Sequence, residues 1–140
     1  MSRETKKGKK SIVIRRTAQR LIANIPEKAW LREVKALHAF VRDKIRYTKD
    51  IRGVETIHSP EKILEFGQGD CDDKSILLAS LLESIGHPTR FVAVGFRPSS
   101  YSHVLVETRI GNKWLPLETT ERVNVGWYPK GVKIRLVRHN

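Results

Sequence analysis

The sequence predicts an α+β domain, in which a helical first half packs on an antiparallel sheet formed by the second half. Three observations lead to this prediction. Residues 70–86 carry leucine and isoleucine around much of a helical circumference, which indicates a buried helix. Apolar residues before this segment recur at helical spacing, and those after residue 89 form short strand-like runs. The length of 140 residues, of which 39% are hydrophobic, suits one domain with a single core.

The N-terminal part of the chain is expected to be an arm followed by helices. Residues 1–10 are polar and rich in lysine and glycine, so we expect them to be disordered, with a single domain over 11–140. Residues 12–14 form either a short strand or the beginning of a helix that runs to Ile22. An amphipathic helix is predicted over 27–46, because apolar residues recur there at spacings of three and four. These residues are Trp30, Val34, Leu37, Val41 and Ile45.

The central helix follows a loop and a short helix. The loop spans 48–58. Ser59 and Pro60 have the form of a helix start, and the short helix that they begin should end before Gly67. The buried helix begins near Asp70 and ends at Gly86.

Three strands are predicted after this helix. The segments 90–96, 103–110 and 113–118 have strand character, and Gly111 with Asn112 forms the turn between the last two. The far ends of the last two strands should therefore meet, which places residues 103 and 118 side by side.

The charge of the chain is concentrated at its two ends. The net charge is +12. Residues 1–20 contain eight basic side chains and one acid, and five basic residues with no acid follow Glu121, so 21–121 is neutral. Basic ends favour an acidic partner or nucleic acid, although a solvated tail is the simpler interpretation.

Composition excludes several classes of protein. No apolar run is long enough for a membrane span, and the first residues lack the apolar stretch of a signal peptide, so a cytoplasmic location is expected. Cys71 is the only cysteine, which excludes an internal disulfide and a multi-cysteine zinc site. Neither the acids around Cys71 nor the histidines have metal-ligand spacing, so we expect no metal and no cofactor.

Cys71 is the candidate nucleophile. It opens the buried helix directly after Gly69 and Asp70, where backbone N–H groups favour negative charge on a thiol. A lone cysteine is commonly a small buried hydrophobe, but flanking glycines and acids are a poor core environment. Because those acids oppose a thiolate, a cation must lie nearby.

His103 and Glu118 complete the candidate site. His103 opens the second predicted strand, from which it can take the proton of the cysteine and later protonate a leaving amine. Glu118 ends the third strand and can orient the imidazole. Each of these residues taken alone is more often structural, and the joint placement of the three favours a catalytic interpretation.

Three ordered segments resemble the transglutaminase-like superfamily of cysteine hydrolases. They are Gly69–Asp73 with the leucine-rich run after it, His103–Glu107, and Trp114–Thr120. The resemblance spans about 30–120 and is closest to small members encoded by tailed phages and prophages. It implies a papain-like fold and a catalytic triad of Cys71, His103 and Glu118. The third position is most often Asp in this family, whereas this chain has Glu118.

An oxyanion hole is also expected. The backbone N–H of Cys71 is the first candidate donor, and Gln68 or Tyr47 is the candidate for a second.

The leading hypothesis is a thiol acyl-transfer enzyme acting on protein amide or peptide bonds. Hydrolysis by a peptidase or deamidase is favoured over cross-linking by a transglutaminase, because a small chain has little structure to exclude water from a thioester. The second hypothesis is a non-catalytic assembly protein, such as one that docks on phage structural proteins. A nucleic-acid binder that uses the basic ends is the third.

Overall fold

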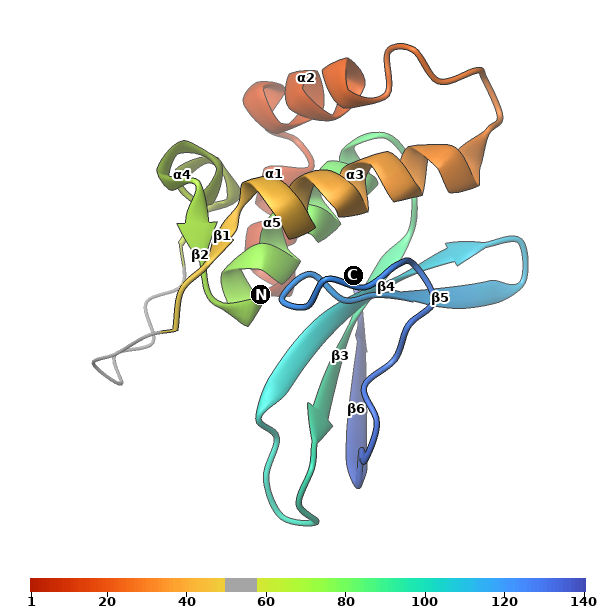
Figure 1. The fold of residues 1–140 in the computed structure, drawn as a ribbon. Helices are drawn as coiled ribbons and strands as arrows, with labels where there is room; N and C mark the ends of the chain where they lie inside the picture. Colours follow the sequence, from red (N-terminus) through yellow and green to blue (C-terminus); the bar gives the residue numbers. More distant parts are fainter. Residues whose placement is uncertain (50–57) are drawn as a thin grey trace.

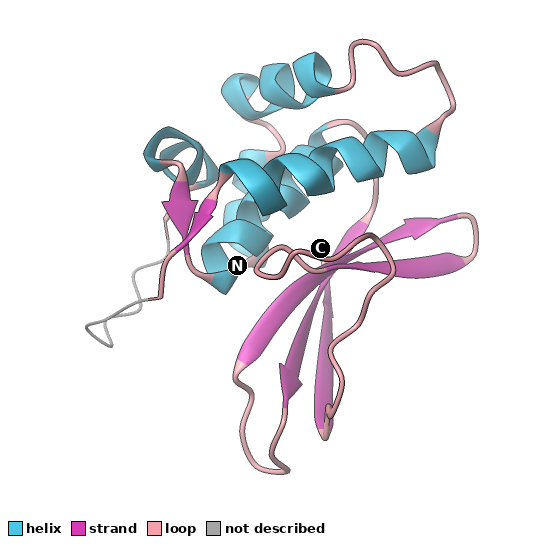
Figure 2. Cartoon of the chain, in the orientation of Figure 1, coloured by secondary structure: helices cyan, strands magenta, loops and turns pink. Residues whose placement is uncertain are grey.

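The computed structural model describes residues 1–49 and 58–140 and confirms the α+β architecture. Helices gather on one side of a twisted antiparallel sheet (Figures 1 and 2). The described helices are α1 Ser2–Gly8, α2 Ile12–Leu21, α3 Trp30–Lys44, α4 Pro60–Phe66 and α5 Cys71–Ser84. The described strands are β1 Arg46–Tyr47, β2 Gln68–Gly69, β3 Thr89–Gly95, β4 His103–Ile110, β5 Lys113–Leu117 and β6 Ile134–His139.

Helix α5 is the centre of the core. It contacts the other four helices on one side and strands β3 and β4 on the other. Its residues from Asp73 to Leu82 are all buried, as its apolar circumference predicts. The helix begins with a capping box, in which the Asp70 carboxylate accepts from the Asp73 N–H at 2.9 Å and the Asp73 carboxylate accepts from the Asp70 N–H at 3.2 Å. This box determines where the first turn of α5, and with it Cys71, begins.

The larger sheet has the strand order β5-β4-β3-β6, with every pair antiparallel. Its α5 face contributes Phe91, Val104 and Val106 to the main core. The opposite face carries a smaller apolar cluster, in which Tyr128 and Val132 pack on Val92, Val94 and Leu105. The segment between β5 and β6 therefore covers the side of the sheet that the helices leave open.

The structure differs from the expectation of a disordered arm over residues 1–10. Ser2–Gly8 forms α1, in which Thr5 and Gly8 are buried, and α1 packs on α5. Gly8 allows the close approach, since a Cβ at this position would lie 2.4 Å from Ser80 Oγ and 2.7 Å from Pro60 Cγ. The buried residues of α1 itself are Thr5 and Gly8, so the contact depends largely on a missing side chain, which hydrophobicity along the sequence does not reveal.

Other differences concern the bounds of elements. The segment from Ile12 is helical, and α3 is shorter at both ends than the predicted helix over 27–46. Strand β6 was not among the predicted strands, because it lies within the basic C-terminal flank and its residues do not alternate between buried and exposed. Of the predicted loop over 48–58, residues 50–57 lie outside the described part of the chain. Within that described part, every helix is too short or too polar to cross a membrane.

Candidate active site

Cys71 is the first residue of α5 and is partly buried. It follows β2, which pairs in parallel with β1 so that Tyr47 lies opposite Gly69. A Cβ on residue 69 would lie 2.5 Å from the Asp73 Cβ, so only glycine lets β2 run this close to the first turn of α5. The backbone N–H groups of that turn give the thiol side of the site a positive electrostatic potential.

His103 and Glu118 form a short hydrogen bond beside this thiol. The Nε2–H of His103 donates to Glu118 Oε2 at 2.6 Å, and the two side chains are 18% and 2% exposed. Cys71 lies close enough to His103 to raise the pKa of its imidazole. Because Nε2 is engaged by the carboxylate, Nδ1 is the ring nitrogen left for the sulfur. The structure thus brings together the three side chains that the sequence analysis singled out.

The carboxylate of Glu118 is held by further donors. Its Oε1 accepts from the backbone N–H of Thr120 at 3.0 Å and from the Thr120 hydroxyl at 2.9 Å. The carbonyl oxygen of Glu118 accepts from Nε2 of His38, a buried residue of α3, at 2.6 Å. Both the side chain and the backbone of Glu118 are therefore fixed, and this is not the solvated strand end that an isolated glutamate would suggest.

The electrostatics of the pair favour an imidazolium. Burial alone would lower the pKa of His103, but its interactions with Cys71 and Glu118 raise that pKa from 6.5 to about 10. Burial alone would raise the pKa of Glu118, but hydrogen bonds from His103 and Thr120 hold it below its ordinary value. His103 is thus the cation that the acids around Cys71 require.

Lys74 is a second cation near the site and was not among the candidate residues predicted from the sequence. Its side chain is almost fully buried under the first turns of α5, and Nζ donates to the Arg42 carbonyl at 3.3 Å. Burial lowers the pKa of Lys74 to about 8, against the opposing effect of the Glu118 and Asp43 carboxylates. The sequence does contain a signal for this residue, because Lys74 stands close to the leucines of a helix that is predicted to lie in the core.

The acids that flank Cys71 have separate roles. Asp70 and Asp73 cap α5, and burial raises the pKa of Asp73. Asp72 Oδ1 lies 3.9 Å from the sulfur of Cys71. Within residues 1–49 and 58–140, no group of three or more metal-binding side chains has a geometry that could hold a metal ion.

The two candidate oxyanion donors lie in different environments. Tyr47 shares a cavity with His103 and Glu118. Burial and the nearby Cys71 and Asp70 raise the pKa of Tyr47, so its hydroxyl keeps its proton at neutral pH. Gln68 lies on β2 with its side chain exposed and is not among the residues that line this cavity. Of the two side chains, Tyr47 is the better placed to donate.

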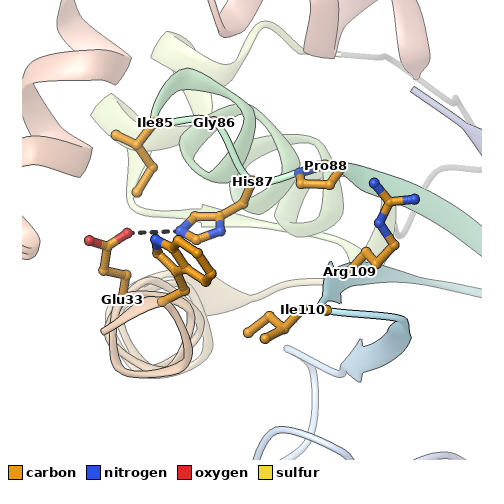
Figure 3. Close-up of a pocket in the computed structure, with 9 residues that line it drawn as sticks. Glu33, Ile85, Gly86, His87, Pro88, Arg109 and Ile110 are labelled. Carbon is orange, nitrogen blue, oxygen red and sulfur yellow. Dashed lines mark hydrogen bonds and ion pairs between the residues drawn. The ribbon is translucent and has the colours of Figure 1, made fainter. Parts of the chain in front are cut away.

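A second cavity lies at the other end of α5 and has no part in this arrangement (Figure 3). Its volume is about 440 Å³, and its wall includes Trp30 and Arg109. His87 Nε2 and Glu33 Oε1 are 2.9 Å apart there.

Comparisons with solved structures show which proteins share this fold. A candidate protease from Parabacteroides distasonis ATCC 8503 matches with a TM-score of 0.68 and 15% identity, over 84% of this chain and 25% of that protein. A candidate cysteine protease from Cytophaga hutchinsonii matches with a TM-score of 0.63 and 17% identity, over 91% of this chain and 46% of that protein. LapG from Legionella pneumophila matches with a TM-score of 0.60 and 17% identity, over 94% of this chain and 85% of that protein.

The chain therefore spans less than half the length of the first two of these structures. No curated protein matches it. The family model of the transglutaminase-like superfamily matches residues 15–119, which is most of the chain and includes all three residues of the candidate site. The chain belongs to the transglutaminase-like superfamily.

Proposed function

We propose that the chain is a thiol-dependent acyl-transfer enzyme that hydrolyses amide or peptide bonds of proteins. The observation that supports this most is the buried Glu118–His103 pair at the N-terminus of the helix that carries Cys71. A raised pKa of His103 keeps an imidazolium beside the sulfur at neutral pH, which is the condition for a reactive thiolate.

Acylation begins with attack of the Cys71 sulfur on a carbonyl carbon of the substrate. The new C–S bond moves the carbonyl electron pair onto oxygen, and the backbone N–H of Cys71 donates to that oxyanion, with Tyr47 as the candidate for a second donor. His103 then gives its proton to the leaving nitrogen as the C–N bond breaks. An amine departs and a thioester remains on Cys71.

Deacylation uses the same imidazole in the opposite direction. His103 takes a proton from water, the resulting hydroxide attacks the thioester carbonyl, and the C–S bond breaks to regenerate the thiolate. Glu118 stabilises the charged ring in both steps and keeps its orientation. Thr120 and His38 act through Glu118 as positioning residues.

Mass spectrometry of a mixed peptide library distinguishes the three outcomes of this chemistry. The library is incubated with the protein in the presence of a fluorescent primary amine. Peptide cleavage indicates a peptidase, conversion of glutamine to glutamate indicates a deamidase, and amine incorporation indicates a cross-linking transglutaminase. We expect hydrolytic products, because the candidate site is open to water on the side of His103.

Thiol reactivity tests the enzyme against the non-catalytic alternative. Cys71 should react with iodoacetamide at pH 6, and His103→Asn should slow this reaction by about tenfold or more because the paired cation is lost. His87→Asn is the matched control, since His87 also pairs with a glutamate but lies in the second cavity. Equal rates in all three proteins would favour a structural protein that retains the fold.

We also propose that the two basic ends form one surface for the backbone of a nucleic acid. Arg3 at the start of α1 and Arg138 of β6 line one cavity of about 560 Å³, although 134 residues separate them in the sequence. This cavity therefore has one cation from each charged flank in its wall. Rows of cations attract phosphates by releasing counterions, and this requires no base-specific contact.

A further inference from the structure

A cavity of about 380 Å³ adjoins the candidate catalytic pair. This volume lies in the range of small-ligand sites. Of the three candidate catalytic side chains, His103 and Glu118 belong to its wall and Cys71 does not. The cavity therefore lies on the imidazole side of the thiol.

The side of the thiol matters because the two halves of a substrate leave the site differently. The acyl half stays bonded to Cys71, whereas the amine half departs with a proton from His103. The leaving nitrogen must pass within hydrogen-bond distance of the imidazole, so the residue attached to it lies against the cavity. The same position receives an amine that attacks the thioester in the reverse direction.

Three aromatic side chains from distant parts of the chain form the apolar part of this wall. Tyr47, Phe96 and Trp127 are 46%, 42% and 36% exposed and line the same cavity, so they form a shared apolar surface that a ligand can reach. Aromatic side chains offer a large contact area at a low cost in conformational entropy.

Each of the three is tied to a strand or strand pair that carries the candidate site. Tyr47 lies opposite Gly69, two residues before Cys71. Phe96 follows β3, in which Val94 lies opposite His103. Trp127 follows Gly126, whose N–H donates at 2.9 Å to the carbonyl of Pro116, two residues before Glu118. The aromatic wall is thus held in register with the reacting groups.

The charges around the cavity are balanced. Glu121 and Lys130 both belong to the wall, as do Glu118 and the imidazolium of His103. A strongly charged occupant would meet charges of both signs in the wall, whereas an apolar occupant would bury aromatic surface.

We propose that this cavity binds a bulky apolar or aromatic side chain of the amine half of the substrate. In a peptidase, that side chain belongs to the residue directly after the cleaved bond. The proposal rests on the thiol acyl-transfer function proposed above and adds its specificity.

Amine partitioning of an acyl-enzyme tests the proposal without knowledge of the natural substrate. p-Nitrophenyl acetate acetylates Cys71 and releases nitrophenol, and the thioester is then resolved by water or by an added amino-acid amide. In the second case the amine nitrogen forms a C–N bond with the acetyl carbon, the C–S bond breaks, and the amine proton passes to His103. The ratio of N-acetyl product to acetate is independent of the acylation rate.

We expect phenylalaninamide to capture the acetyl group roughly tenfold better than alaninamide, because its benzyl group is partly buried in the cavity. Trp127→Ala should reduce this preference to about twofold or less, and Trp127→Phe should retain most of it. Trp30→Ala is the matched control, since Trp30 is an exposed tryptophan of the second cavity. It should leave the preference unchanged.

Three results would overturn the proposal, and each is distinct. Nitrophenol release with equal capture of both amides would show that the cavity does not select. Preferred capture by the side-chain amine of a lysine derivative would assign the cavity to a cationic acceptor. Absence of nitrophenol release that depends on Cys71 would remove the proposed function and this inference with it.

Discussion

Glu118 is the residue on which the candidate site depends most. Its two carboxylate oxygens and its carbonyl accept hydrogen bonds from three different residues, and its side chain is 2% exposed. A buried carboxylate with so many donors remains charged, because the donors replace the water that it lost. The charge of Glu118 stabilises the imidazolium of His103, and this imidazolium in turn favours the thiolate of Cys71.

Substitution of Glu118 separates orientation from charge. Glu118→Gln keeps the shape but removes the charge that favours the imidazolium, so alkylation of Cys71 at pH 6 should slow markedly. Glu118→Asp should retain more reactivity, because the carboxylate charge remains even though the shorter side chain reaches less far towards His103. The measurement is the rate of iodoacetamide alkylation against pH in the three folded proteins. Superimposable curves would remove Glu118 from the mechanism and leave a Cys71–His103 dyad.

The raised pKa of His103 has a consequence for stability. The folded protein retains a proton between pH 6.5 and about 10 that the unfolded chain releases, so this group stabilises fully below pH 6.5 and loses its effect as pH rises towards 10. Lys74 acts in the opposite direction above about pH 8, since burial lowers its pKa. The effect of His103 is therefore clearest between pH 6.5 and 8.

Thermal unfolding of the parent and of His103→Gln measures this linkage. The difference in Tm between the two proteins should shrink as pH rises from 6.5 to 8, because only the parent loses stability through this group. His38 does not interfere with this measurement. Burial lowers its pKa from 6.5, so its effect on the free energy of unfolding changes with pH below 6.5 and not in the range measured. A difference that stays constant across this range would contradict the hydrogen-bonded imidazolium.

At the scale of elements, α5 is the helix on which the other described helices pack. Helix α1 reaches it through Gly8, where the backbone lies against Ser80 and Pro60. The buried apolar contribution of α1 itself is small, because its buried residues are Thr5 and Gly8. Close packing without large side chains leaves little room for substitution.

Gly8→Val tests this contact. Its side chain must displace Ser80 or Pro60, so we expect a loss of about 1–3 kcal/mol in the free energy of unfolding. Lys7→Val is the control, since Lys7 is exposed on the same helix. Deletion of residues 1–10 should likewise lower the free energy of unfolding, which urea denaturation measures for all three variants. An unchanged free energy of unfolding on deletion would restore the expectation of a disordered arm.

At the scale of the molecule, the cavity lined by Arg3 and Arg138 is separate from the cavity beside the candidate catalytic pair. Cys71, His103 and Glu118 lie in the part of the chain that is neutral overall, although Lys130 of the basic C-terminal end lines the cavity beside His103. The two proposals can therefore be tested independently of each other.

Duplex DNA binding tests the basic surface. The affinity should fall steeply as salt increases, and Arg3→Gln with Arg138→Gln should reduce the slope of log affinity against log salt by about two. Lys113→Gln, on an exposed position of β5, should leave the slope nearly unchanged. Binding that is absent at low salt, or a slope that the double variant does not alter, would contradict a shared nucleic-acid surface.

The sequence by itself determined the α+β class, the position of α5 and the order of Cys71, His103 and Glu118. These features follow from local patterns: apolar periodicity, helix-start residues, and a two-residue turn that pairs the ends of β4 and β5. Such patterns are carried by neighbours in the chain, so no tertiary information is needed to recognise them.

Only the tertiary structure decided the environment of those residues. The donors from Thr120 and His38, the buried cation of Lys74, the packing of α1 and the aromatic wall of Tyr47, Phe96 and Trp127 became visible in it. His38 lies 80 residues from Glu118, and the three aromatic residues lie in separate segments of the chain. Burial and hydrogen bonding arise between residues that are distant in the chain, and no local pattern records which of them will meet.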